Sequence, residues 1–227
     1  MELAEKEDLS LSTLGKIFSV LIVALVLSAC SGGSSNSGGG GSNASSDFRF
    51  LYDHNANLLG GYTVRWETNT VKVYTAGIPG AEAALNRWNS TANFVFVGSP
   101  PSDGISFSVI NSSTYCGVTN TYYLNSGKIT QAVVQIAADQ SNCRGGLANT
   151  LAHETAHALG FFGHTADGGL MDPDGGNGSI TSPVRNFFSL LYSHPYGWNI
   201  APFLPSTKLP SGLYQANGNQ VRVRVDY

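Results

Sequence analysis

Five residues in the twelve-residue segment HETAHALGFFGH restrict what this chain can fold into: His153, Glu154, His157, Gly160 and His164. Side chains four residues apart project from the same face of an α-helix, so His153 and His157 can reach one metal ion. Glu154 lies ~100° further round the helix, where it can hydrogen-bond a water on that ion and act as a general base. The spacing therefore predicts a metal-binding helix.

A catalytic zinc site needs three protein ligands and an open fourth position. His164 is the candidate for the third ligand, because Gly160 can end the helix in a left-handed conformation and turn the chain back toward the ion. No glutamate follows Glu154, which removes a glutamate ligand from a later helix, and His54 and His194 lie outside the motif.

An ordinary amphipathic helix can carry the same histidines as solvated or core residues. Gly160, His164 and a downstream methionine favour the metal site over that alternative. Apart from the initiator, Met171 is the only methionine in the chain, and it stands in GGLMDP. The flanking glycines and proline predict a tight turn there.

This combination resembles the signature of the metzincin metallopeptidases, HExxHxxGxxH followed by a methionine turn. The usual third histidine would fall at Gly163, and here the histidine comes one residue later. Bacterial matrixin-like members show a similar GxxGH variant. The resemblance covers about residues 62–197, and it implies Zn²⁺ held by His153, His157 and His164, with Met171 packed below. Asp167 is the alternative third ligand, since aspartate replaces the last histidine in some relatives.

The resemblance implies an α+β catalytic domain with a twisted mixed sheet of about five strands. An active-site helix, a second N-terminal helix and a C-terminal helix after the methionine turn would accompany the sheet. It also implies a zinc-dependent endopeptidase that uses a zinc-bound water, with Glu154 as general base. Pro173 stands where several metzincins have a tyrosine, so oxyanion stabilisation is expected to rest mainly on zinc.

A function of another class is a surface-binding lipoprotein that retains the scaffold without turnover. Glu154 argues against it, because a module that only binds has no need for a base beside the metal. A peptidase that acts on cell-wall peptides is a narrower alternative.

Apolar periodicity predicts the scaffold around the motif. Strands are expected at 62–74, 94–97, 105–110 and 132–137. Helices are expected at 79–89 and from Ser182, with Pro183 at the first helical position and Val184, Phe187, Phe188 and Leu191 on one face.

Residues 117–131 predict a hairpin-like edge with its turn at 125–127. By the same resemblance, an extended substrate pairs antiparallel with an edge strand upstream of the zinc helix. Tyr122, Tyr123 and Leu124 are the candidates for that substrate wall. A solvent-facing hairpin without a ligand is the alternative.

The C-terminal extension, 201–227, ends in VRVRV at 221–225, which alternates like an exposed or edge strand. Arg222 and Arg224 would lie on a solvated face or contact an acidic partner. The role of the extension is not evident from the sequence.

The N-terminal 29 residues resemble a bacterial lipoprotein signal, with an apolar run at 17–27 and the lipobox-like LSAC that ends at Cys30. The run is too short for a membrane span. Cys30 would be lipidated, 30–46 would be a Gly/Ser-rich tether, and 47–200 would form the peptidase domain. A plain secretory signal is the alternative. The expected product is an exported lipoprotein at the outer membrane or cell surface rather than the inner membrane.

Cys116 and Cys143 then remain as a pair in an exported protein, where oxidation is permitted. We expect a disulfide between them, with thiol ligation of zinc as the alternative. The net charge of −3 and the lack of a Lys/Arg cluster give nucleic-acid binding little support. The expected partners are a peptide or protein substrate and a membrane, for a monomeric protein.

Overall fold

A computed structural model describes residues 40–204 and 219–227 of the chain. The helices are α1 Gly40–His54, α2 Ala81–Leu85, α3 Gly146–Ala158 and α4 Ser182–Tyr192, with 3₁₀ turns at Ala56–Leu59, Asn86–Trp88 and Ala201–Phe203. The strands are β1 Arg65–Trp66, β2 Thr70–Tyr74, β3 Asn93–Phe96, β4 Gly104–Ile110, β5 Gly117–Leu124, β6 Lys128–Ala137 and β7 Gln220–Asp226.

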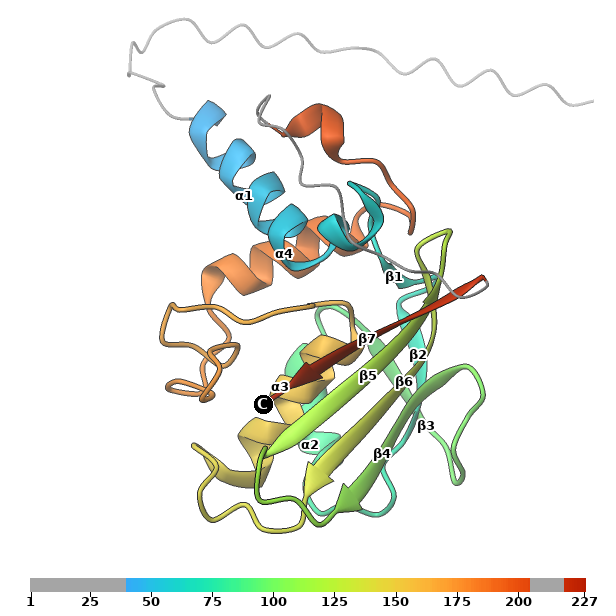
Figure 1. The fold of residues 1–227 in the computed structure, drawn as a ribbon, viewed down its shortest axis with the longest axis vertical. Coiled ribbons are helices and arrows are strands. Elements are labelled where there is room, and N and C mark those ends of the chain that lie inside the picture. The colour runs from blue at the N-terminus through green and yellow to red at the C-terminus, as the bar shows by residue number, and fades with distance from the viewer. Residues whose placement is uncertain (1–39, 205–218) are drawn as a thin grey trace, which may run out of the picture. The chain divides into compact units, whose positions relative to one another are not determined.

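The seven strands form one mixed sheet in the order β3-β2-β4-β6-β5-β7, and the short β1 pairs with β6 (Figure 1). The pairs β2–β3, β2–β4, β4–β6 and β1–β6 are parallel, whereas β5 is antiparallel to both β6 and β7. The mixed α/β class is confirmed, and the expected count of about five strands is corrected to seven within the described residues.

The two additional strands have separate origins. The expected strand at 62–74 is divided by polar turn residues at 67–69 into β1 and β2. The second addition is β7, which comes from the C-terminal extension and pairs with β5. As a result β5 lies inside the sheet, and the expectation of an edge strand at that position is wrong.

The other expected elements form close to their expected bounds. The helix expected at 79–89 is α2 followed by a 3₁₀ turn, and the helix expected from Ser182 is α4. Thr181 rather than Ser182 stands at the N-cap position of α4, and its side chain makes no capping hydrogen bond. The expected hairpin turn joins β5 to β6, with the Gly127 amide donating to the Leu124 carbonyl at 2.8 Å. Gly127 has a φ of +86°, a conformation that a side chain would strain.

Helix α3 packs against β5 and β6, and two tryptophans fix its backbone. The Trp88 indole N–H donates to the Ala152 carbonyl at 2.8 Å, and the Trp66 indole N–H donates to the Ala158 carbonyl at 2.9 Å. Both indoles are buried, so each hydrogen bond is shielded from water. These contacts hold the metal-motif helix at its middle and at its C-terminal end.

Helices α1 and α4 pack together, with Leu51, Tyr52, Phe187 and Phe188 in the core. The signal 1–29 and Cys30 lie outside the described residues. Of the expected tether, only 40–46 is described, and its backbone forms the first turns of α1. None of the helices in the described ranges is long and apolar enough to cross a membrane.

Candidate metal centre

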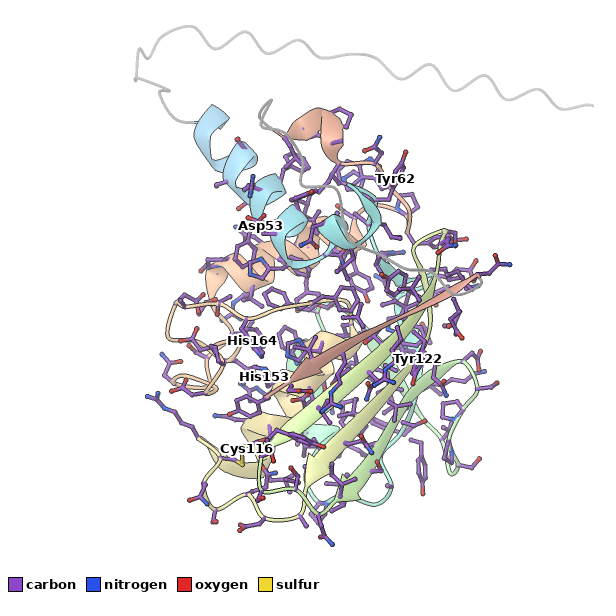
Figure 2. The ribbon with its side chains drawn as sticks, viewed as in Figure 1. Asp53, Tyr62, Cys116, Tyr122, His153 and His164 are labelled. Carbon is purple, nitrogen blue, oxygen red and sulfur yellow. A yellow bond between two sulfur atoms is a disulfide. The ribbon has the colours of Figure 1, made fainter. Side chains whose placement is uncertain are left out.

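Three histidines converge at the C-terminal end of α3. His153 and His157 lie one helical turn apart and are fully buried, and the half-buried His164 returns from the loop after the helix. Figure 2 shows His153 and His164 beside each other. The Nε2 atom of His153 lies 2.9 Å from Nε2 of His157 and 3.2 Å from Nε2 of His164. One ligand atom from each of the three residues lies within 4.8 Å of the other two, a group that could hold a metal ion.

Backbone carbonyls determine which ring nitrogen carries the hydrogen. Nδ1 of His153 lies 2.6 Å from the Leu170 carbonyl, and Nδ1 of His157 lies 2.6 Å from the Phe161 carbonyl. A carbonyl oxygen only accepts, so both Nδ1 atoms must donate, and a neutral ring then carries a lone pair on Nε2. Two lone pairs therefore face each other at 2.9 Å.

Protonation does not relieve this contact near neutral pH. Burial lowers the pKa of His153 to about 3 and the pKa of His157 well below its ordinary value, and repulsion between the neighbouring histidines lowers the latter further. Burial also lowers the pKa of His164. Neutral imidazoles with converging lone pairs are the donor set of a metal cation.

The end of α1 positions the loop that carries His164. The side-chain Nδ2 of Asn55 donates to the carbonyls of Val64 and Gly160, both at 2.7 Å. Gly160 has a φ of +109°, and a Cβ there would lie 2.9 Å from the Val64 oxygen. Nε2 of His54 lies 3.2 Å from the His164 carbonyl. The turn predicted at Gly160 is thus held in place by residues a hundred positions earlier.

Asp167 is not part of the histidine cluster. Its carboxylate accepts from the Thr165 hydroxyl at 2.9 Å, the Thr181 hydroxyl at 2.6 Å and the Gly169 amide at 3.1 Å. Asp172 accepts from the Asp167 amide at 3.0 Å, and its Oδ1 lies 2.8 Å from the Thr165 hydroxyl oxygen, whose single hydrogen can serve either carboxylate. The two carboxylates order the loop, and the structure brings His164 rather than Asp167 to the other histidines.

Met171 lies in the tight turn that its neighbours predict. The Asp172 amide donates to the Gly169 carbonyl at 3.1 Å, and the Met171 carbonyl accepts from the Thr165 amide at 2.8 Å. The Met171 side chain is fully buried in the core. The preceding residue, Leu170, supplies the carbonyl that orients His153, so the turn and the histidine cluster are directly connected.

Glu154 is fully buried beside β5. Its Oε2 accepts from the Thr119 hydroxyl at 2.6 Å, whereas its Oε1 has no hydrogen-bond partner among the described protein atoms. A Cβ on Gly117 would lie 2.6 Å from that Oε1, so only glycine leaves room for the carboxylate. Burial raises the pKa of Glu154 to about 8, against the lowering effect of the Thr119 hydrogen bond.

The aromatic ring of Tyr227 covers one histidine of the cluster. It stacks on the His153 ring with centroids 4.2 Å apart and planes 20° apart. Its hydroxyl lies 3.1 Å from the Arg144 carbonyl and 3.3 Å from the Asp174 carbonyl. No local motif predicts the roles of Tyr227 and Thr119, because their positions follow from strand pairings.

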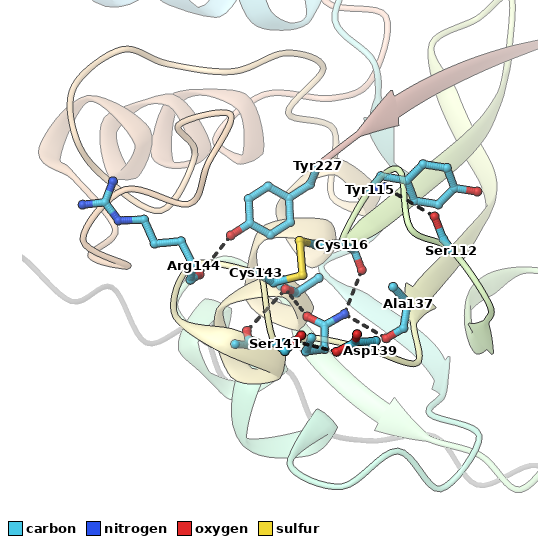
Figure 3. Close-up of a disulfide and its surroundings, with 12 residues drawn as sticks. Ser112, Tyr115, Cys116, Ala137, Asp139, Ser141, Cys143, Arg144 and Tyr227 are labelled. Carbon is cyan, nitrogen blue, oxygen red and sulfur yellow. Dashed lines mark hydrogen bonds between the residues drawn. A yellow bond between two sulfur atoms is a disulfide. The ribbon is translucent and has the colours of Figure 1, made fainter.

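The disulfide between Cys116 and Cys143 confirms the expected pairing, with 5.7 Å between the two Cα atoms (Figure 3). It links the start of β5 to the loop that enters α3. The side chain of Gln140 strengthens this connection. Its Nε2 donates to the Cys116 carbonyl at 3.0 Å, and its Oε1 accepts from the Thr150 hydroxyl at 2.7 Å. Because both sulfurs are bonded to each other, neither is free to bind the metal.

The substrate-wall candidates lie on β5 between two other strands. Tyr123 is fully buried and stacks on Phe162, with ring centroids 6.3 Å apart. Its side chain belongs to the core and lines no open surface. Tyr122 and Leu124 are half-buried.

No protein-family model matches this chain, and no curated protein matches it significantly.

Proposed function

We propose that this protein is a zinc-dependent endopeptidase of metzincin type. The observation that carries the proposal is the convergence of the Nε2 atoms of His153, His157 and His164, two of them fixed as lone-pair donors by backbone carbonyls. Three neutral imidazoles leave one position open on a tetrahedral ion, which is the arrangement of catalytic rather than structural zinc.

Zinc fits this donor set, because imidazole is a preferred zinc ligand and the carboxylates of the neighbouring loop are engaged with hydroxyls and amides. When bound, zinc lowers the pKa of a coordinated water toward ~7 and polarises a substrate carbonyl. The hydrogen bonds from Nδ1 of His153 and His157 to backbone carbonyls orient the rings and increase their basicity toward the ion.

Glu154 is the proposed general base. Its Oε2 is held by Thr119, and its Oε1 is free to accept a proton and deliver it to the leaving amine. The raised pKa of Glu154, about 8 in the metal-free protein, suits a group that must both take up and release a proton near neutral pH. A nearby cation would lower this pKa and favour the ionised base.

The proposed substrate is an extended peptide, as the resemblance to metzincins implies. Because β5 lies between β6 and β7, a peptide could pair with β5 only after β7 moves aside. We also propose export on a lipid anchor at Cys30, with the protein attached to the outer membrane or cell surface. The disulfide supports an oxidising compartment. A binding protein without turnover is the second candidate, which the complete burial of Glu154 favours.

The test is cleavage of a diverse peptide library by the zinc-loaded chain, with products identified by mass spectrometry. Because Tyr227 covers His153, the native chain and Tyr227→Ala are both assayed. Defined products should disappear in Glu154→Gln and after chelation, and they should persist in Glu82→Gln, which alters an exposed glutamate on α2. If neither the native chain nor Tyr227→Ala cleaves any peptide while binding zinc, the binding protein becomes the better account.

A further inference from the structure

The part of β5 nearest the metal cluster is attached directly to α3. The Thr119 hydroxyl lies 3.1 Å from the Glu154 carbonyl, and the Thr121 hydroxyl lies 3.3 Å from the His157 carbonyl. One edge of β5 is taken by β6. The other edge is therefore where an extended peptide would hydrogen-bond beside the proposed base and metal ligands.

That edge is already filled by the chain's own β7. Pairing runs antiparallel from Leu124 opposite Gln220 to Val118 opposite Asp226. Gly117 and Tyr227 continue the ladder, since the amide of each donates to the carbonyl of the other, at 3.2 and 2.9 Å. These backbone hydrogen bonds do not depend on side-chain identity, so β7 uses the contacts that a peptide substrate would need.

The last residue of this ladder, Tyr227, also covers His153. The Tyr227 ring lies on His153, and Glu154, His153 and His157 have no exposed surface. A peptide carbonyl cannot reach buried groups without movement of whatever covers them. Among the described strands β7 stands at the end of the sheet order, so it is held along one side only.

We propose that β7 is an internal occupant of the peptide-binding edge of β5, which keeps the site closed until the strand is displaced. This inference rests on the proposed function, because it assigns the regulation of that same site. β7 makes few side-chain bonds to β5. Arg222 donates to Asn120 at 2.9 Å, whereas Arg224 pairs with Asp226 of its own strand at 2.7 Å. Backbone pairing with β5 and the stacking of Tyr227 on His153 therefore hold β7 in place more than side-chain hydrogen bonds do.

The ladder supplies two proline variants of the full chain that differ in whether the replaced amide pairs with β5. Val223 is half-buried against the core and Arg224 is exposed, so the first variant also loses apolar packing. Gly117 and Tyr227 exchange both backbone hydrogen bonds, and hydrogen-bonded pairs recur at every second residue of an antiparallel ladder. Val223, which lies opposite Thr121, is therefore in a hydrogen-bonded pair, and its amide donates to β5. The Arg224 amide then faces away from β5. Val223→Pro removes a ladder hydrogen bond, whereas Arg224→Pro places the same residue at a position that an edge strand tolerates.

The probe is a fluorescein-labelled synthetic peptide with the sequence of residues 219–227, titrated into each zinc-loaded full-length variant. If only molecules with β7 displaced can bind the peptide, the apparent affinity is reduced in proportion to the fraction of such molecules. We therefore expect Val223→Pro to bind the peptide at least ~10-fold more tightly than Arg224→Pro and the native chain do. Its cleavage of library peptides should rise by a similar factor. Equal affinity in the three proteins, or tighter binding without faster cleavage in an active enzyme, would overturn the inference.

Failure of the proposed function gives a different result. If Val223→Pro binds the peptide more tightly but no variant cleaves any substrate, the edge is a peptide site closed by β7 and the protein is not a peptidase. If the native chain cleaves peptides as fast as Val223→Pro, the peptidase stands and the closure is wrong.

A second pair of variants covers the case in which Val223→Pro does not fold. Tyr227→Ala keeps every backbone hydrogen bond and uncovers His153, so cleavage should increase several-fold. Asn120→Cys with Arg224→Cys places cysteines at a non-hydrogen-bonded pair, where a disulfide can form. The cross-linked protein should be inactive and recover on mild reduction, with the native chain reduced in parallel as control. Full activity of the cross-linked protein would contradict the proposal.

Discussion

At the scale of single residues, hydrogen bonds from carbonyl and hydroxyl groups decide what the side chains can do. Leu170 and Phe161 contribute only a backbone oxygen each, yet these oxygens fix the tautomers of His153 and His157. Thr119 similarly fixes one oxygen of Glu154 and leaves the other free. The motif supplies the chemical groups, and neighbours far away in sequence give them their orientation.

Replacement of Thr119 by valine should impair the proposed base while leaving the fold intact. The Thr119 hydroxyl lowers the pKa of Glu154, so its loss should raise that pKa and move the acidic limb of the pH dependence of kcat/KM to higher pH. We expect activity at neutral pH to fall on the order of tenfold, which is less than the ~10²–10⁴-fold contribution of a general base because Glu154 itself remains. Thr121→Val is the control, because Thr121 contacts the His157 backbone and not Glu154. An unshifted acidic limb would contradict this role.

The metal-free protein should be most stable near pH 6.5. The pKa values of His153, His157 and His164 are lowered by burial, so below about pH 6.5 the unfolded chain binds protons that the folded chain does not, and stability falls with pH. Glu154 acts in the opposite sense, because its raised pKa makes the folded chain bind a proton between its ordinary value and about 8. Stability should therefore also decline gently from pH 6.5 to 8.

Urea unfolding of the chelated protein at pH 5, 6.5 and 8 measures this dependence. Each uncompensated proton changes the unfolding free energy by ~1.4 kcal/mol per pH unit, so the acid side should be the steeper one. Stability that rises from pH 6.5 to 5 would show that the histidines are not buried in the neutral form.

At the scale of elements, sequence patterns predicted the helices and turns that depend on interactions between residues close in sequence. Helix α3, the hairpin turn and α4 follow from apolar spacing, glycine and proline positions in the sequence. The pairing of β7 with β5 could not be predicted in this way, because alternation in VRVRV indicates a strand without specifying its partner. For the same reason, neither the contact between Tyr227 and His153 nor the number of strands in the sheet could be predicted from the sequence.

The disulfide should stabilise the link between β5 and α3. It closes a loop with a sequence separation of 27, for which the chain-entropy relation gives about 3–4 kcal/mol. We expect Cys116→Ser with Cys143→Ser to lower the unfolding free energy by that amount in urea titrations. The reduced native protein should match the double variant. A loss below about 1 kcal/mol would mean that the loop is ordered without the bond.

At the scale of the whole molecule, a metal ion would join segments that the chain connects only through a glycine turn. His153 and His157 belong to α3, His164 belongs to the following loop, and His54 of α1 lies against the backbone of His164. The cluster therefore lies between the sheet-packed helix and the α1–α4 part of the protein. Occupancy of the site should affect the stability of the complete domain.

Zinc should accordingly raise the melting temperature of the full chain. Free zinc at 100-fold above its dissociation constant adds ~2.7 kcal/mol, and each kcal/mol raises Tm by roughly 2–4 °C in a domain of this size. Scanning calorimetry with and without a chelator should show a difference of roughly 5–10 °C, and His157→Ala should remove it. An equal zinc effect on His157→Ala would place the ion elsewhere.

The most direct test of the central claim is zinc K-edge X-ray absorption of the purified chain carrying one equivalent of the metal. We expect three imidazole nitrogens and one further light atom at about 2.0–2.1 Å from the zinc. The imidazole scattering should fall by about a third in His164→Ala, which removes one of the three proposed histidine ligands. Sulfur scattering, coordination without three imidazoles, or a spectrum unchanged by His164→Ala would contradict the assignment of the histidine cluster as the metal centre.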